Sequence, residues 1–226
     1  MNIADEIYSH LLQQKNGFFV DCGAHNGVWL SKTKCFEDNG WDGICIEPNP
    51  KLSKLLQVNR KGSLHFDCAL SDVDDEIAEL HYCGRTEEMS GSGSILPYDS
   101  LPNGRHALPT HFHKCTTKTL NTLFLENNIT HVDFLKTDLE GMDARVLLNL
   151  NFHNVSVSLL CYEMFPAYIN RPKMYALPNK TNTILEKHLT DNGFVKLLDN
   201  KEQSKYFKGI DMVWVHQSFY DKFKQV

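Results

Sequence analysis

Short apolar segments alternate with amphipathic segments along most of the chain. The amphipathic segments repeat apolar residues every three or four positions, as Ile3, Ile7 and Leu11 do within residues 3–14, and this spacing is typical of helices. The apolar segments, such as residues 18–21, lack alternation, as expected of strands buried on both faces. The order strand, helix, strand, helix, strand predicts a parallel sheet with right-handed crossovers.

The same pattern predicts the remaining elements. Strands are predicted over residues 18–21, 43–47, 63–68, 76–82, 132–137, 157–163, 194–198 and 209–215, and helices over 29–39, from Pro50, over 119–127, around 146–150 and over 183–192. The last two strands are too close in sequence for a full helix between them, so the last strand is predicted to be antiparallel. Because no repeat or linker occurs, we expect a single domain over residues 1–226.

Composition narrows the class of protein. The 226 residues are 42% hydrophobic and carry a net charge of -5 without a basic stripe, so we expect no nucleic-acid partner. Seven cysteines without a Cys-x-x-Cys pair indicate reduced thiols in an intracellular, cytoplasmic protein. No apolar run reaches membrane-spanning length, so no membrane span is expected. The oligomeric state stays open.

Acidic residues stand at the ends of four predicted strands: Asp21, Glu47, Asp138 and Glu163. In an open α/β sheet, ligands bind at the carboxyl ends of the strands. Glu47 follows Gly23 by 24 residues, about the spacing of the acid that binds a ribose. The pattern therefore predicts a nucleotide-type cofactor at this edge of the sheet.

The turn after the first strand reads Asp21-Cys22-Gly23-Ala24-His25-Asn26-Gly27. Its glycines are Gly23 and Gly27, so the three-glycine fingerprint of a dinucleotide site is missing. A looser turn suits a cofactor without a pyrophosphate. S-adenosylmethionine is such a cofactor, with its amino-acid end over the turn.

Four stretches carry a resemblance to a known family: residues 20–27, 41–50, 69–72 and 133–141. In this order and spacing they resemble the FkbM-type methyltransferases, which have the class I S-adenosylmethionine-dependent fold. The matches span residues 17–165, and the rest of the chain matches in general character. The resemblance implies a Rossmann-like α/β fold, with a seven-stranded, mostly parallel sheet, an antiparallel last strand and helices on both faces.

The resemblance also implies an activity and a cofactor site. The family mostly methylates oxygen, often a hydroxyl of a sugar or a natural product. Glu47 would bind the ribose, and Ser31 would reach the methionine carboxylate. The cofactor-binding residues implied are Asp21, Gly23, Ala24, Gly27, Ser31, Glu47, Asp67, Cys68 and Asp138, with Asp67 and Cys68 near the adenine.

A hydroxyl is a poor nucleophile at neutral pH, so the transfer needs a general base or a metal ion. Asp138 and Glu163 end neighbouring predicted strands and could share a divalent ion such as magnesium or manganese; catalysis without metal is the alternative. Glu140 is another candidate base, or a carboxylate in the first turn of a helix. His25 is a further candidate base, or a polar residue that lines the site.

Two long segments, residues 83–114 and 164–179, show no regular pattern, and such segments in compact domains are usually functional. Because both follow strand ends at the cofactor edge, we expect them to form the acceptor pocket. They offer aromatic residues for stacking on a sugar or for ordinary loop packing: Tyr98, Phe112, Phe165, Tyr168 and Tyr175.

The first of these segments also contains His106, His111 and His113, followed by Cys115. Their spacing fits no closed zinc site. We therefore expect His111 and His113 to lie on a lid or substrate loop.

Two other functions stay open. A nicotinamide-dependent sugar oxidoreductase or epimerase would need a Tyr-x-x-x-Lys pair, and Tyr220 and Lys224 form one in the C-terminal segment, away from the predicted sheet edge. The missing third glycine argues against this class. A non-catalytic glycan-binding module on a methyltransferase fold is the other alternative, and the four acids at strand ends argue against it. The favoured acceptor is a sugar hydroxyl of a small molecule or glycan.

Overall fold

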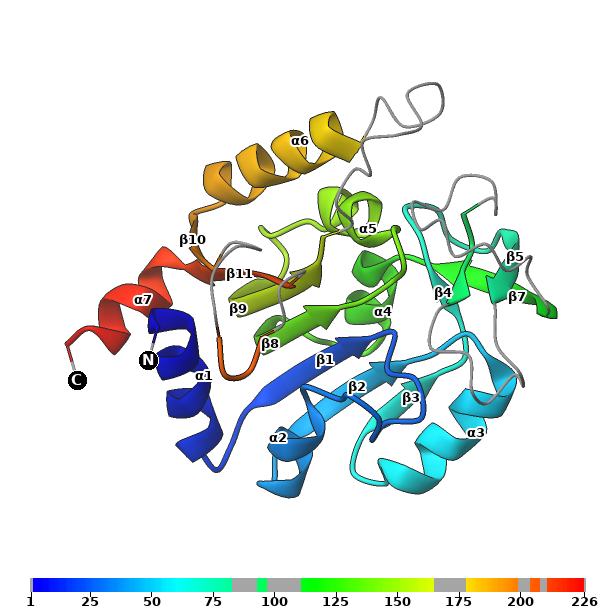
Figure 1. The fold of residues 1–226 in the computed structure, drawn as a ribbon, viewed down its shortest axis with the longest axis horizontal. Coiled ribbons are helices and arrows are strands. Elements are labelled where there is room, and N and C mark those ends of the chain that lie inside the picture. The colour runs from blue at the N-terminus through cyan, green and yellow to red at the C-terminus, as the bar shows by residue number, and fades with distance from the viewer. Residues whose placement is uncertain are drawn as a thin grey trace.

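The computed structural model describes residues 2–82, 93–96, 111–164, 178–198, 204–207 and 211–225. A central sheet lies between two layers of helices, and a smaller sheet lies to one side (Figure 1). The chain therefore has the α/β architecture that the alternation of strands and helices predicts.

The central sheet has seven strands in the order β10-β11-β9-β8-β1-β2-β3. Their bounds are β1 (Phe18–Cys22), β2 (Asp42–Ile46), β3 (Leu64–Phe66), β8 (His131–Thr137), β9 (Ser156–Glu163), β10 (Phe194–Leu198) and β11 (Asp211–His216). Neighbouring strands from β3 to β9 are parallel, whereas β11 lies between β9 and β10 and is antiparallel to both. The predicted seven-stranded sheet with an antiparallel last strand is confirmed.

The second sheet contains β4 (Ala69–Leu70), β5 (Ile77–Tyr82), β6 (Gly93–Ser94) and β7 (His111–Lys118), in the order β4-β7-β5-β6. In Figure 1 it lies beyond the carboxyl ends of β1 and β2. The prediction that residues 83–114 are irregular is wrong at residues 93–94, which form β6, and at 111–114, the first half of β7. The prediction for residues 164–179 is wrong at 178–179, where helix α6 (Pro178–Asp191) begins. Within the two irregular segments, residues 83–92, 97–110 and 165–177 lie outside the described residues.

Helices cover both faces of the central sheet (Figure 1). One layer contains α1 (Ile3–Gln13), α2 (Lys34–Asp38), α3 (Pro50–Asn59) and α7 (Gln217–Phe223), and the other contains α4 (Leu120–Glu126), α5 (Asp143–Asn149) and α6 (Pro178–Asp191). The sequence pattern did not predict α7. Six cysteines are described and all are free, in agreement with the predicted reduced thiols.

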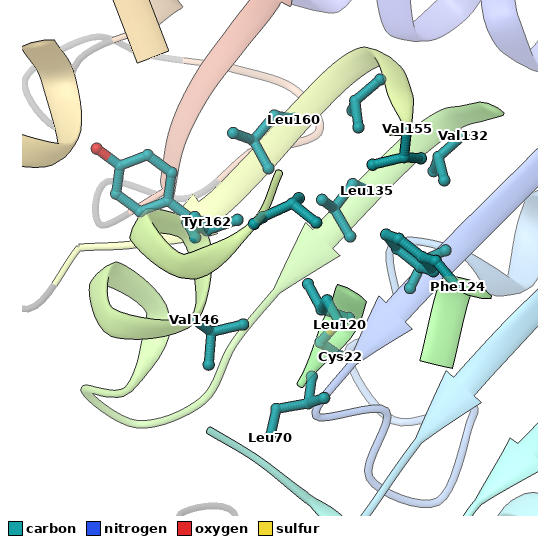
Figure 2. Packing of buried hydrophobic residues seen from close by; sticks show 14 of the residues in the cluster. Cys22, Leu70, Leu120, Phe124, Val132, Leu135, Val146, Val155, Leu160 and Tyr162 are labelled. Atoms are coloured by element: carbon teal, nitrogen blue, oxygen red, sulfur yellow. The ribbon is translucent and has the colours of Figure 1, made fainter. Parts of the chain in front are cut away.

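Consecutive residues of a central strand enter opposite cores. Leu135 of β8 and Leu160 of β9 pack with Leu120 and Val146 of the second helix layer (Figure 2). Phe134, next to Leu135, packs in the cluster beneath the first layer. Burial on both faces explains why consecutive residues of these strands, such as Phe134 and Leu135, are apolar.

Three predicted helix starts can be compared with the structure. Helix α3 begins at Pro50 as predicted, and Asn49 caps it, because the Asn49 side chain accepts hydrogen bonds from the amides of Lys51 and Leu52. The predicted start at residue 29 is wrong, since α2 begins at Lys34. The predicted start at Thr183 is also wrong, because α6 begins at Pro178. Along the described ranges, no helix combines the length and apolar character needed to cross a membrane.

Candidate active site

A cavity of about 290 Å³ opens at the carboxyl ends of the parallel strands. Its volume is near the lower end of the range for small-molecule sites, roughly 300 Å³. Most of the predicted site residues line it: Asp21, Gly23, Ala24, His25, Ser31, Glu47, Cys68, Asp138, Glu140 and Glu163. Gly27 and Asp67 lie outside this lining. The second sheet closes one side through Leu80, Gly93 and Ile95.

Gly23 is required by the packing of the turn after β1. Its φ is +76°, and a Cβ added there would lie 2.0 Å from the carbonyl oxygen of Asp138. The amides of Gly23 and Ala24 both donate to the carbonyl oxygen of Ile46, each at 3.0 Å. The turn is therefore wedged between the ends of β2 and β8, where no side chain fits.

The segment after Gly23 is a turn rather than a helix. The side-chain oxygen of Asn26 accepts hydrogen bonds from the amides of Val28, at 3.0 Å, and Trp29, at 2.8 Å. Leu30 adopts a positive φ of 54°, which a helix does not tolerate. Gly27 lets this turn pack closely against Arg60, because a Cβ at position 27 would lie 2.5 Å from Cγ of Arg60 and clash with it.

Asp21 is a buried anion held by three side chains. The hydroxyl of Thr33 donates to Asp21 Oδ2 at 2.5 Å, and Nζ of Lys136 lies 3.2 Å from Oδ1. The guanidinium of Arg60, which also pairs with Glu37, lies 3.8 Å from Oδ2. Asp21 therefore fixes the turn between β1 and α2.

Lys136 links the turn to the end of β8. Its Nζ donates to the carbonyl oxygen of Gly23 at 3.2 Å and lies 3.5 Å from Asp138 Oδ2. Burial lowers the pKa of Lys136, but the charges of Asp21 and Asp138 outweigh burial and raise it above the ordinary value. A lysine inside an apolar strand was the available sequence signal, and our prediction did not use it.

Glu47 is buried, and two backbone amides hold its carboxylate. The amide of His25 donates to Oε2 and that of Asn49 to Oε1, each at 2.9 Å. Burial raises the pKa of Glu47 to about 7, although these two hydrogen bonds oppose the rise. Each carboxylate oxygen can accept a second hydrogen bond, and the binding of ribose hydroxyls by Glu47 stays a prediction.

Across the cavity, Asp138, Glu140 and Glu163 form an acidic cluster. One carboxylate oxygen of each lies within 4.8 Å of the others. Burial, together with the charges of Asp138 and Glu140, raises the pKa of Glu163 to about 10. Burial also acts to raise the pKa of Asp138, but Lys136 and a hydrogen bond from Glu163 lower it. At neutral pH, Glu163 therefore carries a proton and donates it to ionised Asp138.

The loop after β8 holds the acidic cluster in place. Asp143 accepts hydrogen bonds from the Thr137 hydroxyl, at 2.6 Å, and the Leu139 amide, at 3.1 Å. Glu140 has a φ of 49°, and its carbonyl oxygen accepts a hydrogen bond from the Ser94 hydroxyl at 2.9 Å. Glu140 precedes the first residue of α5, so it is not a first-turn carboxylate of that helix.

Ser31 lines the cavity, but its hydroxyl oxygen accepts hydrogen bonds from the amides of Thr33, at 3.2 Å, and Lys34, at 3.1 Å. The neighbouring Lys32 also lines the cavity, where it pairs with Asp211. Sequence reasoning missed both members of this pair. Lys32 lay within a predicted helix. Asp211 is the first residue of an antiparallel strand, and our prediction placed only the last residues of strands at this edge.

Aromatic side chains near the cavity differ from those predicted. Trp29 lines the cavity with 52% of its surface exposed, and its ring lies 5.0 Å from that of His25. Phe112 is exposed on β7 beside His81 and is not part of the lining. The other predicted aromatic residues lie outside the described residues: Tyr98, Phe165, Tyr168 and Tyr175.

The histidines that suggested a lid lie on a strand. His111, His113 and Cys115 alternate along β7 and so share one face of it. His113 pairs in register with Leu80, which lines the cavity. His106 is outside the described residues. Asp67 accepts a hydrogen bond from Ser53, away from the cavity.

The pair expected of an oxidoreductase lies elsewhere. Tyr220 belongs to α7 and Lys224 caps that helix, with Nζ 4.0 Å from the Tyr220 ring. No described residue of α7 lines the cavity.

A family comparison covers most of the chain. The model of the Methyltransferase FkbM domain family matches residues 21–212. No curated protein matches the chain.

Solved structures give further similarities. A TehB-like SAM-dependent methyltransferase from Corynebacterium glutamicum is 9% identical over 93% of this chain and 87% of that chain, with a TM-score of 0.44. A ribosomal protein L11 methylase from Lactobacillus delbrueckii is 8% identical over 94% and 78%, with a TM-score of 0.43. Fibrillarin from Aeropyrum pernix, in complex with S-adenosyl-L-methionine, is 11% identical over 90% and 67%, with a TM-score of 0.42.

Proposed function

Since the chain belongs to the FkbM methyltransferase family and uses S-adenosylmethionine, we propose that it methylates a hydroxyl oxygen of a sugar, free or within a glycan. The domain that does so spans residues 1–226. Both substrates bind in the cavity at the carboxyl ends of β1, β2, β8 and β9. The acceptor lies on the side of the acidic cluster.

The residues present fit the cofactor. Glu47 has carboxylate lone pairs for two ribose hydroxyls, and Cys68, Leu70 and Leu80 give an apolar wall for the adenine. The turn at Gly23 carries no side chain that would block the methionine. When bound, the cofactor would supply a methyl group on a positively charged sulfur. An acceptor oxygen in line with the carbon–sulfur bond would bond to the methyl carbon as that bond breaks, the sulfur leaving as the thioether of S-adenosylhomocysteine and the hydroxyl proton passing to a carboxylate. Much of the rate then depends on alignment by these walls.

The observation that carries the proposal is the acidic cluster in the same cavity as Glu47. An acceptor hydroxyl must lose its proton, and Asp138 and Glu140 offer carboxylate oxygens to accept it. A divalent ion such as Mg²⁺ or Mn²⁺ would be held by Asp138 and by Glu163, which would release its proton to bind the ion. Bound there, the ion would lower the pKa of the hydroxyl. His25 then serves as a lining residue.

The charge of the cavity favours a neutral acceptor. Its described lining contains two lysines, Lys32 and Lys136, and six acids: Asp21, Glu47, Asp138, Glu140, Glu163 and Asp211. This excess of negative charge disfavours phosphate or carboxylate acceptors. Trp29 adds an aromatic face at the mouth of the cavity for the apolar side of a sugar ring.

A methyl-transfer assay tests the proposal. Purified protein is incubated with methyl-labelled S-adenosylmethionine and a panel of neutral glycans, with magnesium or manganese and, in parallel, with a chelator. We expect label on a sugar hydroxyl and loss of activity in the chelator. We also expect Asp138→Asn to lower kcat by about tenfold or more, the lower end of the usual effect of a positioned acid or base.

The control is Glu79→Gln, which removes an exposed carboxylate on β5 outside the cavity and should leave kcat unchanged. Full activity in the chelator would reject the metal and leave the carboxylates as the base. Transfer to amine acceptors, with none to any hydroxyl, would reject the proposed O-methyltransferase.

A further inference from the structure

The cavity contains an ion pair that the proposed chemistry does not use. Nζ of Lys32 lies 3.1 Å from Oδ2 of Asp211, and both side chains are largely buried, with exposed fractions of 14% and 6%. Asp211 starts β11 and pairs in register with Glu163. The ion pair therefore lies beside the acidic cluster, at the end of the cavity away from Glu47.

The backbone of Lys32 is fixed from both sides. The hydroxyl of Tyr8, buried in α1, donates to the carbonyl oxygen of Lys32 at 2.5 Å. The next residue, Thr33, donates its hydroxyl to the buried Asp21. These contacts place the lysine on a rigid support, which suits a residue that orients a ligand.

The second lysine of the described lining is already committed. Nζ of Lys136 contacts Asp21, Asp138 and the carbonyl oxygen of Gly23. Lys32 pairs with Asp211 alone among the described acidic side chains. The Ser31 hydroxyl oxygen accepts hydrogen bonds from the amides of Thr33 and Lys34 at the start of α2. A carboxylate entering this end of the cavity would therefore meet Lys32 as its nearest available cation.

We propose that the Lys32–Asp211 pair recognises the amino-acid end of the cofactor, with Lys32 binding the α-carboxylate and Asp211 the α-ammonium group. The two opposite charges of the pair match the two opposite charges of an α-amino acid. Ser31 keeps its capping role. This assignment rests on the methyl donor in the proposed function and is independent of the acceptor.

Three probes separate the two contacts by calorimetric titration. S-adenosylhomocysteine has both charged groups, decarboxylated S-adenosylmethionine has the ammonium group, and 5′-methylthioadenosine has neither. Lys32→Met should weaken the binding of S-adenosylhomocysteine by about 10- to 100-fold, the range for a charged hydrogen bond. The affinities of this variant for the other two probes should be unchanged. Asp211→Asn should weaken the binding of both probes that carry the ammonium group and leave the affinity for 5′-methylthioadenosine unchanged.

Each single variant leaves one buried charge without its partner, which can destabilise the fold. The double variant, Lys32→Met with Asp211→Asn, buries a neutral pair and should fold. It should bind 5′-methylthioadenosine as tightly as the wild type does and S-adenosylhomocysteine more weakly. Lys34→Met is the matched control, since Lys34 pairs with Asp38 on α2 away from the cavity.

Equal affinity of the wild type and the double variant for S-adenosylhomocysteine would overturn the proposal. Equal weakening of all three probes would also overturn it, because it would indicate a distorted cavity. If the wild type binds none of the probes, the methyl donor itself is in error. Failure to methylate glycans, with probe binding as expected, would affect the acceptor assignment and leave this one standing.

Discussion

The two ends of the cavity hold negative charge in opposite ways. At the end of β2, each carboxylate oxygen of Glu47 accepts a hydrogen bond from a backbone amide, at 2.9 Å. At the ends of β8 and β9, the oxygens of Asp138, Glu140 and Glu163 gather within 4.8 Å of one another. Glu47 is buried and faces two fixed backbone donors, whereas the members of the cluster are half-buried and face one another's carboxylates.

The difference shows how one sheet edge supports two tasks. Backbone amides at Glu47 belong to the turn and to the start of α3, so they hold the carboxylate in one orientation for a neutral partner. In the acidic cluster, Asp138 and Glu163 share a proton. The first arrangement suits binding, and the second suits taking up a proton or a cation.

The largest expected effect comes from the point where the two ends meet, at Gly23. Gly23→Ala would place a Cβ 2.0 Å from the Asp138 carbonyl oxygen at a positive φ, so both ends must shift. We expect a loss of about 3 kcal/mol or more in the free energy of unfolding, as for strain and overpacking in a core, together with loss of S-adenosylhomocysteine binding. Urea unfolding and calorimetry measure the two effects.

Gly40→Ala is the matched control. Gly40 also has a positive φ, of 90°, but the nearest atom to an added Cβ is 3.6 Å away. This change should cost about 1 kcal/mol of stability and leave binding intact. Equal effects at the two glycines would show that the wedge between β2 and β8 does not matter.

An intermediate effect is expected for Glu47→Gln as a function of pH. The pKa of Glu47 rises from 4.5 to about 7 on folding, so its contribution to stability is full below pH 4.5 and is lost as the pH rises through 7. We expect the unliganded wild type to lose up to about 3 kcal/mol more than Glu47→Gln between pH 5 and pH 8.

Urea unfolding of both proteins at the two pH values measures this difference. Asp143, whose pKa burial raises to about 6, is present in both proteins, and its contribution therefore cancels. Parallel pH profiles for the two proteins would contradict the assignment to Glu47.

The smallest effect is expected for Glu163→Gln at pH 7. Since the pKa of Glu163 is about 10, the folded protein already carries a proton there, and glutamine also offers a hydrogen to Asp138. We expect a change of less than about 1 kcal/mol in the free energy of unfolding, as for a conserved hydrogen bond. Asp138→Asn should cost more, because it removes a charge that faces Lys136. Strong stabilisation by Glu163→Gln would show that both carboxylates are ionised.

Much of the fold could be predicted because the central strands are buried on both faces. Their largely apolar runs end at Asp21, just before Glu47 and Asp138, and at Glu163, so the acids could be assigned to one edge of the sheet from the sequence. The same rule could have found Asp211. An antiparallel strand begins where its parallel neighbours end, so its first residue reaches this edge too.

Other features depend on contacts that a local pattern does not contain. Residues 29–39 have a helical pattern. The Asn26 side chain accepts hydrogen bonds from the amides of Val28 and Trp29 and holds this segment as a turn, so the helix begins only at Lys34. Lys32 and Trp29 reach the cavity for that reason. Glu140 likewise takes its place through Ser94 of another sheet.

The position of β11 between β9 and β10 sets an order of assembly. During synthesis, the chain that contributes Gly23 and Glu47 emerges long before Asp211, the last residue of the described lining in sequence. Because β9 pairs with β11 and not with β10, this edge of β9 has no native partner until β11 is made, and such non-local pairing is slow. A nascent chain therefore contains the residues for the nucleoside end of the cofactor site first. The amino-acid end is complete only after β11 has paired with β9.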